Sequence, residues 1–333
     1  MSKEKQQVQS DGISVVVPVY NSRETLKDLV IRLESVLGAW GNAFEVILIN
    51  DGSKDNSWQV IEELVDGHKF VRGLNLMRNY GQHNTLLAGI REARHATIVT
   101  IDDDLQHPPE EIPKLLEELN KGHDVVYGAP QAVQHGLCRR LSSQITRIAL
   151  KSVMGVEIAR KVSAFRAFRT QIREGFALYD GPFVSIDVLL GWSTKRFASV
   201  SVRHEQRPSG ESNYTFSKLV SHALDMMTGF STIPLRLASV MGFVFSFFGL
   251  GILIYVFISY LIRGSVPGFP FLASIIAMFA GAQLFALGVI GEYLARIHFR
   301  TMRRPSYSIR STACKTGIRE SNDTQSGESQ DGC

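Results

Sequence analysis

The sequence predicts an α/β domain with a doubly wound, mostly parallel sheet, followed by two membrane-spanning helices. Short runs rich in β-branched residues alternate with helical patterns from Ile13 onward, as they do in βαβ units. Residues 237–291 then contain one charged residue, Arg263, whereas residues 1–235 mix charged and apolar residues as a globular domain does. These two observations define the fold class and divide the chain.

The elements of the α/β part follow from their apolar patterns. Residues 13–19, ISVVVPV, form an unbroken apolar run that suits a strand buried on both faces of a parallel sheet. Residues 23–37 carry apolar side chains at helical spacing and predict the first helix. The same alternation continues to Tyr127. The further expected strands are 44–49, 73–77, 97–101 and 125–127, and the further expected helices are 57–65, 84–93 and 110–120.

Polar residues directly follow three of these strands. Asn21 comes after the first strand, Asp51 after the second and Asp102–Asp104 after the fourth. In a doubly wound sheet, ligands bind beyond the carboxyl ends of the strands. These side chains are therefore expected to converge on one crevice.

Two uncharged spans, 237–262 and 269–291, predict a transmembrane hairpin. The first span is roughly 39 Å long as a helix, enough to cross a hydrocarbon core of about 30 Å. A buried core helix is the alternative for either span alone, but two spans joined by a short turn favour the hairpin. Basic residues cluster after the second span, so the positive-inside rule places the α/β domain and both chain ends in the cytoplasm. These basic residues are Arg296, Arg300, Arg303 and Arg304.

The remaining segments differ in composition. Residues 1–12 are polar, lack the apolar region of a signal peptide and are expected to be flexible. Residues 214–236 are amphipathic and predict a juxtamembrane helix at the interface, with an ordinary surface helix as the alternative. Residues 292–307 form a basic cytoplasmic flank, and residues 308–333, rich in Ser, Thr, Gly and charge, are expected to be disordered.

Charge and cysteine usage exclude several classes of function. The formal net charge of +4 is modest, and no stretch interleaves basic and aromatic residues, so nucleic acid is not an expected partner. The three cysteines, Cys138, Cys314 and Cys333, have neither metal-ligand nor redox spacing and are predicted to be unpaired thiols. No G-x-G-x-x-G follows the first strand, which disfavours a dinucleotide-binding enzyme.

The triplet Asp102–Asp104 points to a metal site. Carboxylates at positions i and i+2 of a loop repel each other, and a divalent cation offsets this repulsion. Mg²⁺ commonly binds one or two carboxylates together with substrate phosphates. A solvated acidic turn is the alternative for an isolated D-x-D motif. Here residues 106–110, Q-H-P-P-E, follow at once after a strand of an α/β chain, and this context favours the metal site.

With these motifs, the sequence resembles the inverting family-2 glycosyltransferases. Within them it looks like the polyprenyl-phosphate glycosyltransferases related to bactoprenol glucosyltransferase and dolichyl-phosphate mannose synthase. The resemblance runs from about Ile13 to Tyr307. The matching segments are V-P-V-Y-N at 17–21, N-D-G-S-K-D at 50–55, R-N-Y-G-Q-H at 78–83, D-D-D-L-Q-H-P-P-E at 102–110, G-E-S-N-Y at 210–214 and G-V-I-G-E-Y at 288–293.

The resemblance implies a GT-A fold, a nucleoside diphosphate sugar as donor, with UDP favoured, and Mg²⁺ or Mn²⁺ as cofactor. Asp102 and Asp104 match the motif that holds the metal and the diphosphate, with Gln106 beside it. The chain departs from the family at Asn50, where a second aspartate is usual, and at Asp103, where alanine is commoner. The positions matching donor-binding residues are Pro18, Tyr20, Asn21, Asp51, Asp103, Arg207 and Ser212.

The chemistry of a lipid phosphate acceptor determines whether the site needs a general base or a cation. An alcohol acceptor needs a general base, whereas a phosphate monoester, with a second pKa near 6, is already anionic at pH 7. Cationic positioning is therefore needed. The resemblance puts Arg166, in S-A-F-R at 163–166, near the acceptor phosphate, and Arg169 is a second candidate. Both could instead be surface arginines, and Ala164 replaces the usual glycine.

The expected enzyme is a multi-pass hexosyltransferase of the cytoplasmic membrane. It moves a sugar to undecaprenyl phosphate with inversion, for modification of envelope glycans. A polysaccharide synthase is one alternative, but no tryptophan follows an arginine as in its Q-x-x-R-W element, and two spans are too few for a polymer channel. A catalytically silent scaffold or sugar-lipid binding protein is another. Glycines in the spans allow close helix packing within one hairpin or in a homo-oligomer, and the sequence leaves both open.

Overall fold

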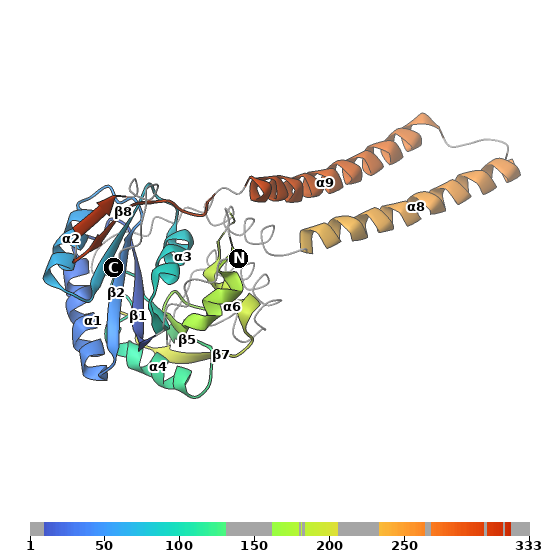
Figure 1. Cartoon of the computed structure of the whole chain (residues 1–333). Helices are drawn as coiled ribbons and strands as arrows, with labels where there is room; N and C mark the ends of the chain where they lie inside the picture. Colours follow the sequence, from blue (N-terminus) through green and yellow to red (C-terminus); the bar gives the residue numbers. More distant parts are fainter. Residues whose placement is uncertain are drawn as a thin grey trace, which may run out of the picture. The chain divides into compact units, whose positions relative to one another are not determined.

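The structure of the chain is a computed structural model (Figure 1). It describes residues 10–130, 162–179, 181, 184–205, 233–263, 268–302, 305–315 and 317–320. The chain divides into two units, one formed by residues 1–214 and 304–333 and the other by residues 215–303. The first unit therefore contains chain from both sides of the apolar region.

The first unit alternates strands and helices, as predicted. Its strands are β1 (Ser10–Val19), β2 (Ala43–Asn50), β3 (Val71–Leu76), β4 (His95–Thr100), β5 (Val125–Pro130), β6 (Arg166–Arg169), β7 (Phe197–Val202), β8 (Ile309–Cys314) and β9 (Gly317–Glu320). Its helices are α1 (Leu26–Trp40), α2 (Ser57–Gly67), α3 (Gln82–Glu92), α4 (Ile112–Asn120) and α6 (Ile186–Ser193), with 3₁₀ turns η1 (Pro109–Glu111) and η3 (Thr170–Phe176).

Within the described residues, the strands form one sheet in the order β7-β5-β6-β4-β1-β2-β3-β8-β9. Strands β4, β1, β2 and β3 run parallel to one another, and β5 runs parallel to β7. The antiparallel strand β6 lies between β4 and β5. The predicted α/β fold with a doubly wound, mostly parallel sheet is confirmed.

Helices cover both faces of the sheet (Figure 1). On one face, α1, α2 and α4 pack against alternate residues of the strands, with Leu29, Ile61 and Leu115 in the core. On the other face α3 crosses β1 and β2. Gly89 allows this close approach, because a Cβ there would lie 2.5 Å from Val16 Cγ1. The parallel strands are thereby buried on both faces, as their unbroken apolar runs require.

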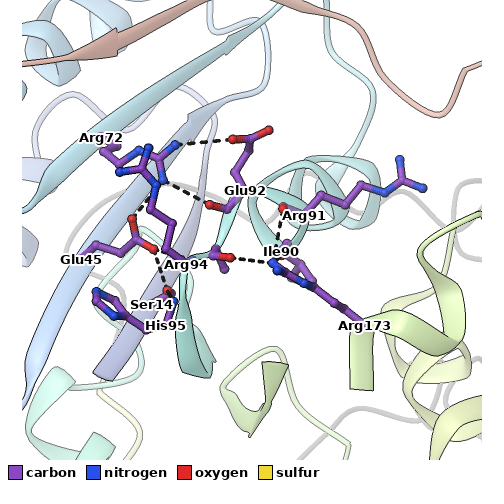
Figure 2. Close-up of polar contacts among 10 residues, drawn as sticks. Ser14, Glu45, Arg72, Ile90, Arg91, Glu92, Arg94, His95 and Arg173 are labelled. Atoms are coloured by element: carbon purple, nitrogen blue, oxygen red, sulfur yellow. Dashed lines mark hydrogen bonds and ion pairs between the residues drawn. The ribbon is translucent and has the colours of Figure 1, made fainter. Parts of the chain in front are cut away.

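A network of ion pairs lies at the amino edge of the sheet, where the parallel strands begin (Figure 2). Glu45 Oε1 accepts hydrogen bonds from Ser14 Oγ at 2.7 Å and from the backbone N–H of Arg94 at 2.8 Å. Glu45 Oε2 accepts one from Arg72 Nη1 at 3.0 Å. Arg72 also pairs with Glu92 at the end of α3. These bonds tie β1, β2, β3 and the end of α3 together at the edge away from the predicted crevice.

The second unit contains two long apolar helices, α8 (Ile233–Arg263) and α9 (Phe269–Thr301). Both are long and apolar enough to cross a membrane, over Leu235–Ile262 and Met278–Ala295. Their large apolar side chains are exposed, with Phe247 71% and Leu284 70% accessible, so these are not core helices. A Cβ on Gly249 of α8 would lie 2.7 Å from Phe279 of α9, so this glycine permits packing within the hairpin.

Several predicted boundaries are wrong. The tail 308–333 is predicted to be disordered, but β8 pairs antiparallel with β3 and β9 pairs antiparallel with β8. Residues 309–314 and 317–320 therefore belong to the sheet, Lys315 lies in the turn between them, and Thr316 lies outside the described residues. Residues 10–12, assigned to the flexible terminus, lie in β1. The flank 292–307 is helical as far as Thr301 because α9 continues through it.

Two further predictions have different outcomes. Cys314, predicted to be an unpaired thiol, is disulfide-bonded, because spacing along a chain does not reveal which thiols meet in space. The juxtamembrane helix expected at 214–236 lies almost wholly outside the described residues, and α8 begins at Ile233.

Candidate functional site

Asp51 fixes the loop that follows β2. Its carboxylate accepts the backbone N–H groups of Tyr80 at 2.7 Å and Gly81 at 2.9 Å, so it joins the loops after β2 and β3. Burial raises the pKa of Asp51, and these two hydrogen bonds oppose the rise. Gly52 has φ 63°, and a Cβ there would lie 2.6 Å from the backbone of Arg78, so only glycine fits this turn.

The loop after β1 meets the same group. Asn21 has φ 55°, a left-handed conformation that asparagine tolerates. Its backbone N–H donates to Ser53 Oγ at 3.0 Å, and its Oδ1 accepts the N–H of Lys54 at 2.8 Å. Tyr20 beside it is 45% exposed, whereas Pro18, the penultimate residue of β1, is buried. The carboxyl edge of the sheet, where β1 to β4 end, thus carries a connected set of loops.

The acidic loop, Asp102–Asp104, joins this set, and its three carboxylates have different partners. Asp102 Oδ1 accepts Gln82 Nε2 at 2.6 Å. Asp103 Oδ2 accepts the backbone N–H of Tyr20 at 3.1 Å. Asp104 Oδ1 accepts the N–H of Gln106 at 3.1 Å. The predicted convergence of Asn21, Asp51 and the acidic loop is therefore present in the structure.

The electrostatics of the acidic loop are those of crowded carboxylates. Burial, followed by the negative charges of Asp104 and Asp103, raises the pKa of Asp102 to about 7. Burial raises the pKa of Asp103 to about 6. Within the described residues, no three His, Cys, Asp or Glu side chains are grouped to hold a metal ion by themselves. The donor set of Asp102 and Asp104 fits a hard cation that takes its remaining ligands from phosphate and water.

Arg166 lies on β6, beside the strand that leads into the acidic loop, and is almost completely buried. On β6 it pairs with Thr100 of β4, two residues before Asp102. Its guanidinium forms an ion pair with Asp187 and lies 5.8 Å from the ring of Tyr127. Its positive charge opposes the rise that burial causes in the pKa of Asp102. Arg166 thus places a cation next to the acidic loop.

The structure does not bring all predicted residues together. Arg169 lies at the far end of β6, paired with Thr97, and its Nη2 donates to the carbonyl of Leu119 at 3.4 Å. Three residues of strand separate it from Arg166 by about 10 Å. Arg207 and Ser212 lie outside the described residues.

His107, three residues beyond the acidic loop, is a packing residue. Its ring stacks on Phe165 with the centroids 5.3 Å apart. Burial, followed by the nearby His204, lowers the pKa of His107 to about 4, so its ring is neutral at pH 7. On the other side of the site, His83 Nδ1 accepts the N–H of Ile186 at 3.4 Å, which links the beginnings of α3 and α6.

Sequence reasoning missed three residues of this site. Gln82 donates to Asp102, Asp187 pairs with Arg166, and Tyr127 donates its hydroxyl to Asp187. A signal for Asp187 was present, since it is the single charge in an apolar stretch, V-S-I-D-V-L-L, that predicts a buried segment. A lone charge in such a stretch requires a buried partner.

Comparison with known proteins gives the family. The model of glycosyl transferase family 2 matches residues 14–175. The undecaprenyl-phosphate 4-deoxy-4-formamido-L-arabinose transferase of Shewanella sediminis is 36% identical over 306 residues, covering 90% of this chain and 92% of that protein. The chain belongs to glycosyl transferase family 2. Its activity is therefore that of a glycosyltransferase, as the sequence predicted.

Other members of the family resemble this glycosyltransferase over similar lengths. Proteins of the same name from Pseudomonas aeruginosa and Klebsiella pneumoniae are 34% and 33% identical, and cover 90% and 89% of the chain. Glucosyl-3-phosphoglycerate synthase of Mycobacterium tuberculosis, solved with Mn²⁺, UDP and phosphoglyceric acid, has a TM-score of 0.50 at 18% identity over 66% of this chain and 76% of that chain. At this identity the likeness shows the fold, which is GT-A.

Proposed function

We propose that this glycosyltransferase moves a sugar from a nucleoside diphosphate, with UDP favoured, to undecaprenyl phosphate at the cytoplasmic face of the membrane. The observation that carries the proposal is the convergence of Asp51, Asn21 and the acidic loop at one edge of a domain attached to two apolar helices. Curated relatives that match about 90% of the chain are named as undecaprenyl-phosphate sugar transferases. Both the site and the relatives support this reaction.

The donor is expected to bind across the loops after β1, β2 and β3. Asp51, Asn21, Tyr20 and Pro18 are the proposed nucleoside contacts. The exposed ring of Tyr20 and the pair formed by Arg78 and Tyr80, whose guanidinium lies 4.4 Å from the ring centroid, offer flat surfaces to a base. Asp103 positions Tyr20 through its backbone N–H, so its contribution to donor binding is indirect.

Asp102 and Asp104 are the proposed holders of Mg²⁺ or Mn²⁺, with Gln106 shaping the loop beside them. The cation would stabilise the charge that develops on the departing nucleoside diphosphate. Solved proteins of this fold contain Mn²⁺ or Mg²⁺ together with UDP, which supports a divalent cofactor. Gln82 fixes Asp102 through a bond of 2.6 Å, so the carboxylate is oriented before any ligand arrives.

Arg166 is the proposed acceptor-phosphate residue, whose charge acts on the phosphate from a buried place beside the acidic loop. The phosphate is anionic at pH 7 and attacks the anomeric carbon without giving up a proton, so the protein needs to position it and to balance its charge. One displacement inverts the anomeric configuration. Arg169 is left out of this proposal because it lies at the other end of β6.

A donor screen tests the proposal. Full-length protein in detergent is mixed with undecaprenyl phosphate, Mn²⁺ and a panel of nucleotide sugars that includes nucleotide-linked 4-deoxy-4-formamido-L-arabinose. The lipid product is read by mass spectrometry and the nucleoside diphosphate by its release. Release that requires both lipid and metal is expected. No release across the whole panel would favour a catalytically silent scaffold instead.

A further inference from the structure

Asp187 is a buried carboxylate to which the proposed function gives no role. It lies in the first turn of α6 and is 7% exposed. Its Oδ1 accepts the hydroxyl proton of Tyr127 at 3.0 Å and forms the ion pair with Arg166 Nη1. Since two groups converge on one oxygen atom, the carboxylate cannot turn without breaking both contacts.

Arg166 is restrained on its own strand as well. Thr100 Oγ1 donates to the carbonyl of Ala164 at 2.6 Å, and Arg166 Nε donates to the same carbonyl at 3.4 Å. The guanidinium is therefore fixed close to two negative centres. One is Asp187, with which it forms an ion pair. The other is Asp102, which comes two residues after Thr100 and whose pKa the charge of Arg166 lowers.

The two negative centres compete for one cation. A guanidinium keeps its charge at every pH that a protein tolerates, so a buried arginine needs a carboxylate partner. Asp187 is that partner in the structure. If the charge of Asp187 were removed, Asp102 would become the partner of Arg166. A guanidinium paired with Asp102 would occupy a carboxylate that the cation needs, and it would turn away from the acceptor.

We propose that Asp187 is a positioning residue for the transfer reaction, which holds the Arg166 guanidinium in its buried place beside the acceptor-phosphate site and keeps it from pairing with Asp102. Tyr127 restrains Asp187 in turn through its hydroxyl. The inference rests on the proposed function, because it assumes that Arg166 meets the phosphate of the acceptor.

The test substitution is Asp187→Asn, which keeps the shape of the side chain and removes its charge. It also leaves a buried arginine without a charged partner and is therefore expected to lower stability, so the test compares its transfer kinetics with those of a control variant that is destabilised in the same way. Glu45→Gln is the matched control, because it removes the carboxylate partner of Arg72 at the amino edge (Figure 2). Glu45 precedes Asp51 by six residues of strand, which is about 20 Å.

Both variants are expected to lower the melting temperature, and only Asp187→Asn is expected to impair transfer. At a temperature where both remain folded, Asp187→Asn should lower kcat/KM for polyprenyl phosphate by about tenfold or more. The metal concentration that gives half-maximal activity should rise by about threefold or more in Asp187→Asn alone, because Arg166 then competes for Asp102. Equal acceptor kinetics in the two variants would overturn the proposal.

A double-mutant cycle tests whether Asp187 acts through Arg166. Arg166→Met removes the cation, so adding Asp187→Asn to it should lower kcat/KM no further. Fully additive losses would mean that Asp187 acts independently, against the proposal. A wild-type protein inactive with every donor counts against the proposed function instead. In that case the structure of Asp187→Asn tests the inference about Asp187. An Arg166 guanidinium that keeps its wild-type position in this variant would contradict the inference.

Discussion

The carboxylates of the acidic loop are adjacent in sequence but differ in what they hold. Asp103 accepts the backbone N–H of Tyr20, and its carbonyl accepts the hydroxyl of Thr25 at 2.6 Å, so it ties the loop after β4 to the start of α1. Asp104 bonds locally to Gln106, within its own loop. One aspartate therefore serves the architecture of the site, while its neighbour remains next to the proposed cation.

This difference predicts unequal tolerance to substitution. Asp104→Asn should lower kcat at least about 100-fold, because a lost metal ligand removes several kcal/mol of charge stabilisation. Its melting temperature should stay near that of the wild type. Asp103→Asn is the matched control: the amide oxygen still accepts the Tyr20 N–H, and kcat should fall less than about tenfold. Steady-state transfer assays compare the two, and equal losses would contradict the metal assignment of Asp104.

The buried Glu45 predicts a pH dependence of stability. Burial alone would raise the pKa of Glu45, but hydrogen bonds from Ser14 and the Arg94 N–H, together with the charge of Arg72, hold it below its usual value of 4.5. Ionised Glu45 therefore stabilises the folded state above about pH 4.5, and this contribution is lost as the pH falls through the lower folded-state pKa.

Glu45→Gln measures that contribution. At pH 7 the variant should be less stable by about 1–3 kcal/mol, since a buried hydrogen-bonded charge is removed. The difference in melting temperature between wild type and variant should shrink as the pH is lowered from about 7 to about 3.5. Thermal unfolding of both proteins in detergent across this range checks the prediction. A difference that stays constant with pH would mean that Glu45 does not titrate in this way.

The sequence located the residues of the site whose positions depend on local structure. Asp51 and the acidic loop each come directly after a parallel strand. Recognising the strand is therefore enough to predict that these residues lie at the carboxyl edge of the sheet. The partnership of Arg166 and Asp187 depends on packing β6 against α6 across 21 residues, and no local pattern encodes it. Arg169 was predicted as a second acceptor-phosphate residue because it is close to Arg166 in sequence. The two residues lie at opposite ends of β6, so proximity in sequence does not bring their side chains together.

At the scale of elements, apolar periodicity predicted β1 to β5 and α1 to α4 to within a few residues. It missed β8 and β9 because the composition after Tyr307 resembles that of disordered chain. The alternation that does exist there is short, with Ser311 and Ala313 buried on one face. Strand β8 exists because it covers the edge of β3, a partner more than 230 residues away. A pairing at such a distance leaves no trace in a local pattern.

Strand β8 also supports the donor loops, which predicts a functional cost when it is broken. Ser308 accepts the N–H of Met77 at 2.9 Å, and Arg310 donates to the Met77 carbonyl at 3.1 Å, directly before the loop that binds Asp51. Ser311→Pro removes a ladder hydrogen bond and should destabilise the domain by on the order of 2 kcal/mol. Nucleotide binding by calorimetry should weaken severalfold. Ser311→Ala keeps the backbone N–H and should bind nucleotide as the wild type does. Equal nucleotide binding by both variants would mean that β8 does not support the donor site.

At the scale of the whole molecule, the pairing of β8 with β3 constrains membrane topology independently of charge. The two strands flank the apolar helices in sequence and belong to one sheet. Chain that leaves the domain before α8 must therefore return to the same side of the membrane after α9. An even number of crossings satisfies this requirement, and a single crossing does not. The positive-inside rule reaches the same topology from the basic residues after the second span.

The topology can be checked with epitope tags in intact and permeabilised cells. A tag inserted at Ser265, between α8 and α9, should be reached by antibody from outside once the outer envelope layers are opened. A tag after Cys333 should be reached only when the cytoplasmic membrane is permeabilised, because β8 pairs with β3 of the domain that we propose to lie in the cytoplasm. The physical reason is that residues 309–314 cannot pair with β3 across a bilayer whose hydrocarbon core is about 30 Å thick. Both tags reached from the same side would mean that the helices lie on the membrane without crossing it, and the acceptor would then have to reach the acidic loop along the surface.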